Sequence, residues 1–145
     1  MQLTEHFSDA ELGVLGCEER LIANASNLCA QLLEPIREYC GAVHVNCGYR
    51  DPSHNARVGG KAASFHLFAG GRAAADITVR VALPAAFDWI RLESGLKFDK
   101  VILETNEAGD PRCIHLQIDS LNAPRREAYI GETGNADDYR PMEVR

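Results

Sequence analysis

The chain has 145 residues, 46% of them hydrophobic and 25% charged, which predicts one ordinary globular domain large enough to bury its own core. The formal net charge of −6 disfavours a nucleic-acid partner, because binding to a phosphate backbone needs clustered Lys and Arg. Anionic membrane surfaces are disfavoured for the same reason, and no apolar run reaches the length of a membrane span.

Five cysteines form an odd, scattered set without CxxC spacing. This set predicts reduced thiols in a reducing compartment rather than a disulfide framework. The N-terminal stretch MQLTEHFSDAEL contains neither the basic nor the apolar region of a secretory signal. We therefore expect a protein made in the cytoplasm, which would need another export route to act outside the cell.

The N-terminal part of the chain predicts helices. Ser8 and Glu11 match a capping box, which predicts a short helix from Leu12. A longer helix is expected over residues 19–40, with a kink at Pro35. Its apolar residues recur at three- and four-residue steps and form one buried stripe: Leu21, Ala25, Leu28, Leu32, Ile36 and Tyr39.

The rest of the chain alternates short strands with turns and helices. Strands are expected at four places: residues 43–47, 74–81, 101–104 and 113–118. A single helical turn ends near Arg57, and Pro84 suits the first turn of a helix over residues 85–92. After Ser120 the chain becomes polar, which predicts a surface tail with one further short strand near residues 128–130. The order of elements predicts a single α+β domain, in which N-terminal helices pack on one face of a small, mostly antiparallel sheet.

Strand alternation brings candidate site residues to the open face of that sheet. Asp76 and Ile77 point to opposite faces of their strand, and His115 alternates in the same way with aliphatic neighbours. If the aliphatic faces pack on the helices, Asp76 and His115 emerge together on the other side. His66, on the glycine-rich loop before residues 74–81, can reach the same place. Two imidazoles and one carboxylate leave a fourth tetrahedral position for water, as in catalytic zinc sites.

Zinc bound there would polarise a scissile carbonyl and lower the pKa of a bound water toward neutrality. A carboxylate is still required to take the proton of that water. Arg50 offers a planar guanidinium fork suited to a substrate carboxylate or to the oxyanion. The residue types together predict hydrolysis.

An ordered series of motifs runs through this region: Gly48-Tyr49-Arg50, Gly59-Gly60, Ser64-x-His66, a Gly/Ala run, Asp76-Ile77 and Ile114-His115. With these motifs the chain resembles the family of zinc D-Ala-D-Ala carboxypeptidases and L-alanyl-D-glutamate endopeptidases. That family includes phage endolysins, and the Hedgehog signalling domain shares its fold. The segments HFSDAEL and NLCAQLLEPIRE also look like its small phage-type members. The resemblance covers the chain from about His6 to Ile118.

The resemblance implies a role for each candidate residue. His66, Asp76 and His115 would be the ligands of a zinc ion. Arg50 would bind a substrate carboxylate or the transition state, and Ser64 would shape the site.

Two departures from the family pattern affect the site. The family usually has the spacing His-x6-Asp, whereas nine residues separate His66 from Asp76, so the Ala69-Gly70-Gly71 region would bulge. The family's catalytic acid often lies three residues before the last histidine, where this chain has Arg112. Three other carboxylates lie nearby in the sequence: Glu104, Glu107 and Asp110. We favour Glu104 as the general base, because related small members also carry Glu at the end of this strand.

Each residue taken alone has an ordinary structural explanation. His66 would be a loop histidine, Asp76 a turn-capping carboxylate and His115 a half-buried strand histidine. Arg50 would form a salt bridge with a neighbouring carboxylate. Cys113, on the same face as His115, is a minor candidate for a soft metal ligand or a nucleophile. Taken together, the ordered set favours the metal site.

We therefore expect a monomeric zinc metallopeptidase that hydrolyses a D-Ala-D-Ala or L-Ala-D-Glu bond in the stem peptide of peptidoglycan. The alternative is a catalytically inactive member of the same fold, serving as a structural or wall-binding module of a phage or cell envelope. Arg112 at the position of the family's acid motivates that alternative, as does the longer spacing between the first two ligands. Hydrolysis of muropeptides that a chelator stops and zinc restores would distinguish the two.

Overall fold

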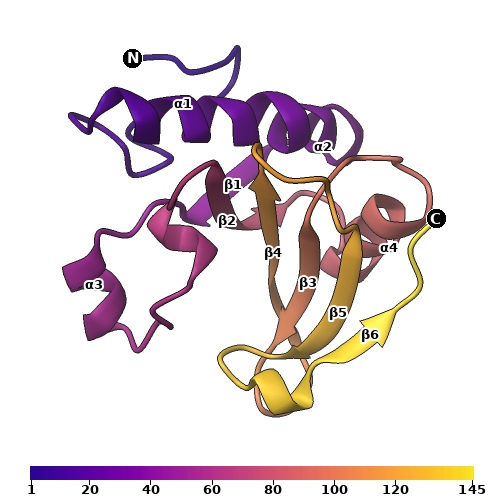
Figure 1. Ribbon diagram of the computed structural model, residues 1–145. Coiled ribbons are helices and arrows are strands. Elements are labelled where there is room, and N and C mark those ends of the chain that lie inside the picture. The colour runs from indigo at the N-terminus through magenta and orange to yellow at the C-terminus, as the bar shows by residue number, and fades with distance from the viewer.

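Helices pack on one face of a six-stranded sheet, which confirms the predicted α+β class (Figure 1). The computed structural model describes all residues, 1–145. The strand order is β1-β2-β4-β3-β5-β6, and every neighbouring pair is antiparallel except β3 and β5. The strands are β1 (Val43–Cys47), β2 (Arg72–Val79), β3 (Lys100–Thr105), β4 (Pro111–Asp119), β5 (Glu127–Glu132) and β6 (Arg140–Met142). The helices are α1 (Glu19–Leu28), α2 (Glu34–Cys40), α3 (Pro52–Arg57) and α4 (Leu83–Leu92).

α1 and α2 form one long helix, joined by a π-helical turn at Cys29–Leu33. This wide turn ends two residues before Pro35, which cannot donate the usual helical hydrogen bond one turn back, so the helix is irregular near the proline. Tyr39 was predicted to be in the core, but it is 60% exposed and stacks on Trp89 with ring centroids 4.2 Å apart. That prediction is wrong because Tyr39 and Cys40, three and four residues after the buried Ile36, both fit helical spacing, and Cys40 takes the core position.

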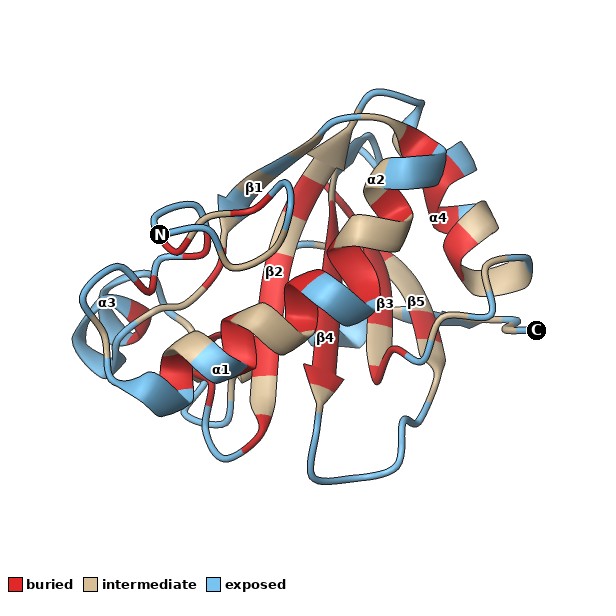
Figure 2. Cartoon of the chain, turned by 90° about the horizontal axis from the view of Figure 1, so that it is seen from above, coloured by how far each residue is buried: buried red, intermediate tan, exposed pale blue.

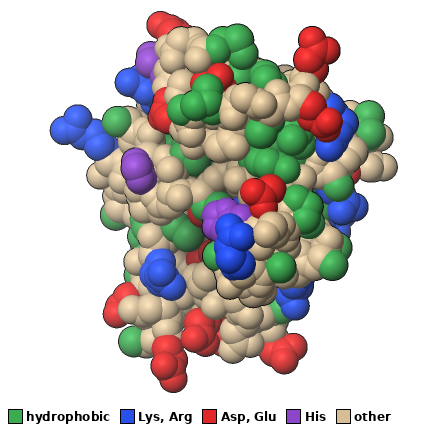
Figure 3. Space-filling view, turned by 90° about the vertical axis from the view of Figure 1, so that its left-hand side faces the viewer, with side chains coloured by type: hydrophobic (Ala, Val, Ile, Leu, Met, Phe, Trp, Pro, Cys, Tyr) green, Lys and Arg blue, Asp and Glu red, His purple; other side chains and the backbone are tan.

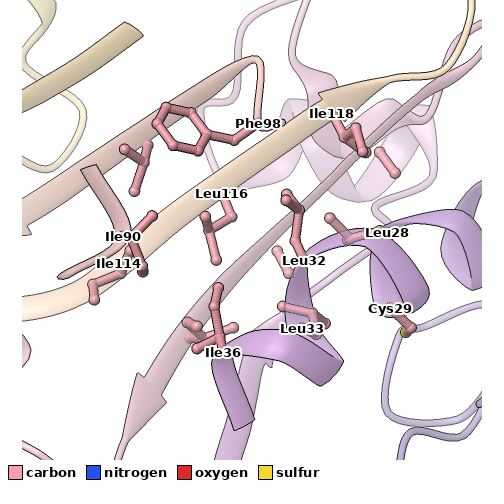
Figure 4. Packing of buried hydrophobic residues seen from close by; sticks show 14 of the residues in the cluster. Leu28, Cys29, Leu32, Leu33, Ile36, Ile90, Phe98, Ile114, Leu116 and Ile118 are labelled. Atoms are coloured by element: carbon pink, nitrogen blue, oxygen red, sulfur yellow. The ribbon is translucent and has the colours of Figure 1, made fainter. Parts of the chain in front are cut away.

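An aliphatic layer joins the helices to the sheet. Figure 2 shows α1 lying across β2 and β4. Along each strand, core residues alternate with residues of the other face, so the core and the candidate site lie on opposite sides of the same strands. Figure 4 shows members of this layer from the helices and from β4: Leu28, Leu32, Leu33, Ile36, Ile90, Ile114, Leu116 and Ile118.

The helix predicted from Leu12 is wrong, although its capping box forms. The Ser8 backbone N–H donates to Glu11 Oε1 over 3.1 Å, and the Glu11 N–H donates to Ser8 Oγ over 3.2 Å. The chain then continues in turns, because Gly13 has a φ of 76° and leaves the helical path. A Cβ at Gly13 would lie 3.0 Å from the Tyr49 carbonyl oxygen, so this turn packs closely on the segment after β1.

The C-terminal residues belong to the sheet, which corrects the prediction of a polar surface tail after Ser120. β5 pairs in parallel with β3, and β6 adds an antiparallel strand at the edge. The short strand predicted near residues 128–130 is confirmed within β5. β5 buries Ala128 but leaves much of its other face polar, so its composition resembles that of a tail. The segment before β6 also brings the Tyr139 hydroxyl back to Glu104.

The connection between His66 and β2 is held by α1. β2 begins at Arg72, two residues before its predicted start, because the bulged loop turns at Phe68 (φ 52°) and Gly70 (φ 57°). Asn24 of α1 is 8% exposed. Its Nδ2 lies within 3.2 Å of three carbonyl oxygens, those of Phe68, Gly70 and Arg72. The bulge predicted from the longer ligand spacing therefore forms as a loop fixed to a helix.

Charges of both signs are mixed on the surface. On the face that Figure 3 shows, Lys and Arg side chains lie among Asp and Glu side chains, and no field of a single sign forms. None of the helices combines the length and the apolar character that crossing a bilayer requires. All five cysteines are free thiols, with Cys29 and Cys40 buried and the others half-buried.

Replacing Asn24 with Ala should lower the free energy of unfolding by about 1–3 kcal/mol, because carbonyl oxygens of the loop lose their buried donor. Urea unfolding in metal-free buffer, followed by circular dichroism, measures the change. Asn27→Ala is the matched control, since Asn27 lies half-buried on the same helix and makes no side-chain hydrogen bond. Equal unfolding free energies for the two variants would contradict this role of Asn24.

Candidate metal site

The register of β2 and β4 places Asp76 directly opposite His115. Both side chains leave the sheet on the face opposite the core, since their neighbours Ile77 and Ile114 are fully buried on the other side. His66 comes from a short 3-10 turn that precedes the loop to β2. Segments far apart in the sequence therefore converge at one point on the open face of the sheet.

The Asp76 carboxylate lies between the two imidazoles. Its Oδ1 is 2.9 Å from His115 Nδ1, and its Oδ2 is 3.3 Å from His66 Nε2. The centroids of the two rings are 5.2 Å apart. His66 is 4% exposed and His115 is 8% exposed, so bulk water screens these contacts little. The structure thus brings together the three residues that the sequence predicts as metal ligands.

Each imidazole has a hydrogen-bond acceptor beside its outer nitrogen. His66 Nδ1 lies 2.7 Å from the carbonyl oxygen of Gly48, which can only accept, so this nitrogen carries a proton. His115 Nε2 lies 2.8 Å from Gln117 Oε1 in a similar arrangement. The inner nitrogens, Nε2 of His66 and Nδ1 of His115, face Asp76 and are the ones available to a cation.

The half-buried Asp76 carboxylate requires positive charge beside it. Burial alone would raise the pKa of Asp76, but hydrogen bonds from His115 and His66 outweigh burial and hold this pKa well below its ordinary value. Burial would lower the pKa of His66, but its contacts with Asp76 and Cys47 raise it to about 10. A divalent cation at this place would displace a proton and supply the same compensation.

Arg50 approaches the same carboxylate from the segment between β1 and α3. Its NH2 atom is 3.9 Å from Asp76 Oδ2. Its Nε donates to Cys47 Sγ over 3.3 Å, and its NH1 donates to Asn55 Oδ1 over 3.1 Å. Gly60 is required for this packing, because a Cβ there would lie 2.0 Å from Asn55 Oδ1 and 3.0 Å from Arg50 NH1. The guanidinium group is therefore held in one orientation.

A cavity of about 630 Å³ opens over these residues. The candidate residues that line it are Arg50, Ser64, His66, Asp76, Glu104 and His115. Ser64 caps the 3-10 turn, since its Oγ accepts a hydrogen bond from the His66 backbone N–H over 3.2 Å. All the predicted site residues therefore border one cavity.

Glu104 is the one candidate base that lines this cavity. It is 8% exposed, and its Oε1 accepts a hydrogen bond from the Tyr139 hydroxyl over 3.1 Å. Its Oε2 accepts from Thr133 Oγ1 over 3.4 Å. Glu107 and Asp110 are exposed in the turn between β3 and β4. Of the three carboxylates, only Glu104 is placed to exchange a proton with a ligand in the cavity.

Two half-buried thiols flank the site. Burial and the neighbouring carboxylates raise the pKa of Cys113, which donates to Glu104 Oε2 over 3.6 Å, so a nucleophilic thiolate is disfavoured. Donor atoms of Cys47, His66 and Asp76 lie within 4.8 Å of one another, as do those of Asp76, Glu104 and Cys113. Both sets contain Asp76, and neither contains His115, whose Nδ1 contacts the other oxygen of this carboxylate from the one that His66 contacts.

A sequence profile of the peptidase M15 family matches residues 3–99, more than half of the chain. The chain belongs to the peptidase M15 family. Peptidases of this family are in general zinc-dependent and act on peptidoglycan. The match includes His66 and Asp76, whereas Glu104 and His115 lie beyond it on β3 and β4. No curated protein matches the chain.

Sequence reasoning does not find most residues that support the site of this M15 family member. They are Cys47, Asn55, Asp99, Arg125, Thr133 and Tyr139. Their roles depend on contacts between segments far apart in the sequence, which leave no local pattern. Gln117 does carry a signal, as a polar residue that shares the face of His115 on an otherwise aliphatic strand.

In the metal-free protein, the raised pKa of His66 predicts a loss of stability in alkaline solution. The folded pKa of about 10 lies above the unfolded value of about 6.5, so the contact with Asp76 stabilises fully below about pH 6.5. This contribution is lost as the pH rises toward about 10. Urea unfolding over this range should show the decline in wild type, and a shallower one in Asp76→Asn. The same slope in both proteins would contradict the prediction.

Proposed function

We propose that this chain is a zinc peptidase that hydrolyses one amide bond of the peptidoglycan stem peptide, either D-Ala-D-Ala or L-Ala-D-Glu. His66, Asp76 and His115 hold the ion, and Glu104 is the general base. Arg50 binds a substrate carboxylate or the oxyanion of the transition state. Membership of the M15 family supports the class of reaction, and the geometry of the cavity supports the assignment of residues.

The observation that carries the proposal is the pair of inner imidazole nitrogens directed at one half-buried carboxylate, that of Asp76. Two nitrogen donors and one carboxylate oxygen fit zinc, and three protein ligands leave a position open, as catalytic sites require. The raised pKa of His66 and the lowered pKa of Asp76 reflect the same demand for positive charge. The cavity of about 630 Å³ has the size of a typical small-ligand site.

Glu104 carries the proton from the attacking water to the leaving amine. Zinc held by the three ligands would polarise the scissile carbonyl and make the attacking water more acidic. The Glu104 carboxylate takes a proton from that water as its oxygen bonds to the carbonyl carbon. The same proton passes to the leaving amine when the C–N bond breaks, so water is the one co-reactant. The hydroxyl groups of Tyr139 and Thr133 hold the Glu104 carboxylate in place for both transfers.

Arg50 supplies a fixed positive charge beside the reacting bond. Cys47 and Asn55 occupy its Nε and NH1 atoms, which leaves the NH2 edge on the side of Asp76. A planar guanidinium held this way suits a substrate carboxylate or a tetrahedral oxyanion. Ser64 contributes indirectly, because its cap on the 3-10 turn sets the position of His66.

The second candidate function is a wall-binding module without turnover, motivated by Arg112 at the position of the family's acid. Arg112 is exposed and does not line the cavity. Glu104 does line it, with two hydroxyl groups bonded to its carboxylate. We therefore favour the enzyme.

Two variants separate metal binding from proton transfer. His115→Ala should lose both bound zinc and hydrolysis of purified peptidoglycan. Glu104→Gln should keep zinc but lose hydrolysis by about 100-fold or more, because the amide cannot take the proton of water. Glu107→Gln, in the exposed turn between β3 and β4, is the matched control and should keep wild-type activity. Elemental analysis measures the zinc, and mass spectrometry of released muropeptides measures hydrolysis and identifies the bond.

Hydrolysis by His115→Ala at the wild-type rate would contradict the metal site. Full activity of Glu104→Gln would remove Glu104 as the base. Zinc bound by wild type without any turnover would favour the wall-binding module.

A further inference from the structure

A line of hydrogen bonds leads from His115 along the open face of the sheet, and two of its members, Gln117 and Arg125, also line the cavity. Gln117 Oε1 lies 2.8 Å from His115 Nε2, and Gln117 Nε2 donates to Asp99 Oδ2 over 2.7 Å. Arg125 closes the line with two hydrogen bonds to Asp99, from Nε to Oδ1 over 2.8 Å and from NH2 to Oδ2 over 2.7 Å. None of these contacts belongs to the proton-transfer chemistry of Glu104.

The backbone fixes the members of this line relative to one another. Gln117 follows His115 by two residues on β4, so the two side chains share the open face of the sheet. Asp99 directly precedes β3, and its backbone N–H donates to the Gln117 carbonyl oxygen over 2.9 Å. Gln117 is 5% exposed and Asp99 is 4% exposed, so their polar atoms depend on these partners rather than on water.

The charge of Asp99 sets the orientation of the Gln117 amide. Burial opposes ionisation of Asp99, but hydrogen bonds from Arg125 and Gln117 outweigh it and lower the pKa of this carboxyl group. An ionised carboxylate can only accept hydrogen bonds, so Gln117 must present its NH2 group to Asp99. The amide oxygen then faces His115 and accepts a proton from Nε2.

We infer that Gln117, Asp99 and Arg125 form a positioning network that keeps a proton on His115 Nε2 and leaves Nδ1 as the metal-binding nitrogen. The inference rests on the proposed function, because it assigns a purpose to the nitrogen that faces Asp76. Hydrogen bonds of this kind on a ligating histidine fix its ring and its tautomer, and their loss weakens metal binding. All three members act through His115 and are positioning residues.

Asp99→Asn tests the network with almost no change of shape. The amide oxygen of the new side chain must serve Arg125, which can only donate, so its NH2 group turns to Gln117. Gln117 then has to accept from residue 99 with Oε1 and to present its own NH2 group to His115. His115 Nε2 must become an acceptor and give up its proton, so that the ring keeps a proton only on Nδ1, the nitrogen that donates to Asp76.

The expected result is a zinc affinity about 10- to 100-fold lower than that of wild type, measured by competition with a chromophoric chelator. The histidine ¹⁵N spectrum of the metal-free protein supplies a second readout that a general loss of stability would not mimic. His115 Nε2 should carry a proton in wild type and lack it in Asp99→Asn. Asp119→Asn is the matched control, because Asp119 also pairs with an arginine, Arg72, at the end of β4 but does not contact a ligand. Its zinc affinity should equal that of wild type.

Gln117→Met is the second variant, in case Asp99→Asn does not fold. It keeps the volume of the side chain and removes the acceptor, and it should lower zinc affinity by a similar factor. Wild-type zinc affinity in either folded variant, or a proton retained on Nε2 in Asp99→Asn, would overturn the network. If wild type itself binds no zinc, the proposed function fails, and the ¹⁵N spectrum alone tests the network. A proton on His115 Nε2 that is present in wild type and lost in Asp99→Asn supports the network. A proton on Nε2 in both proteins overturns it.

Discussion

Asp76 is a half-buried carboxylate, and its negative charge has to be balanced by groups that the fold brings to it. Two imidazoles contact its two oxygens, and a guanidinium group stands slightly farther away. A buried charge without such partners would cost several kcal/mol. The site is therefore electrostatically arranged around one negative group, and the same balance makes it receptive to a divalent cation.

The three ligands come from a rigid pair of strands and from a longer loop. The antiparallel register of β2 and β4 sets Asp76 against His115, with little freedom for either to move. His66 arrives on a loop that is longer than the family pattern, and Asn24 of α1 holds that loop by its carbonyl oxygens. The ligands therefore converge despite the longer spacing between His66 and Asp76, because α1 fixes the loop between them.

The C-terminal part of the chain lines one side of the cavity. β5 extends the sheet beside β3, and the segment after it returns Tyr139 and Thr133 to Glu104. Asp99 and Arg125, at the ends of other elements, reach His115 through Gln117. The site is therefore a property of the whole sheet, since each reacting group is supported by a segment distant in sequence.

The sequence predicts the parts of this arrangement that have a local period. Alternation along the strands correctly assigns Asp76 and His115 to one face, and three- to four-residue spacing correctly predicts the long helix. Tyr39 escapes prediction because helical spacing from Ile36 fits both Tyr39 and Cys40, and only tertiary packing decides that Cys40 is buried. β6 and the pairing of β5 with β3 escape because strands with a polar outer face resemble a tail in composition, although the short strand near residues 128–130 is predicted correctly. The residues around His115 and Glu104 escape because their partners are set by tertiary packing alone.

Zinc K-edge X-ray absorption of the zinc-loaded protein tests the central claim most directly, because it identifies the atoms bound to the metal. The account predicts only nitrogen and oxygen ligands at about 2.0–2.2 Å, with the scattering signature of two imidazoles. A sulfur ligand at about 2.3 Å would place Cys47 or Cys113 on the metal and contradict the site formed by His66, Asp76 and His115.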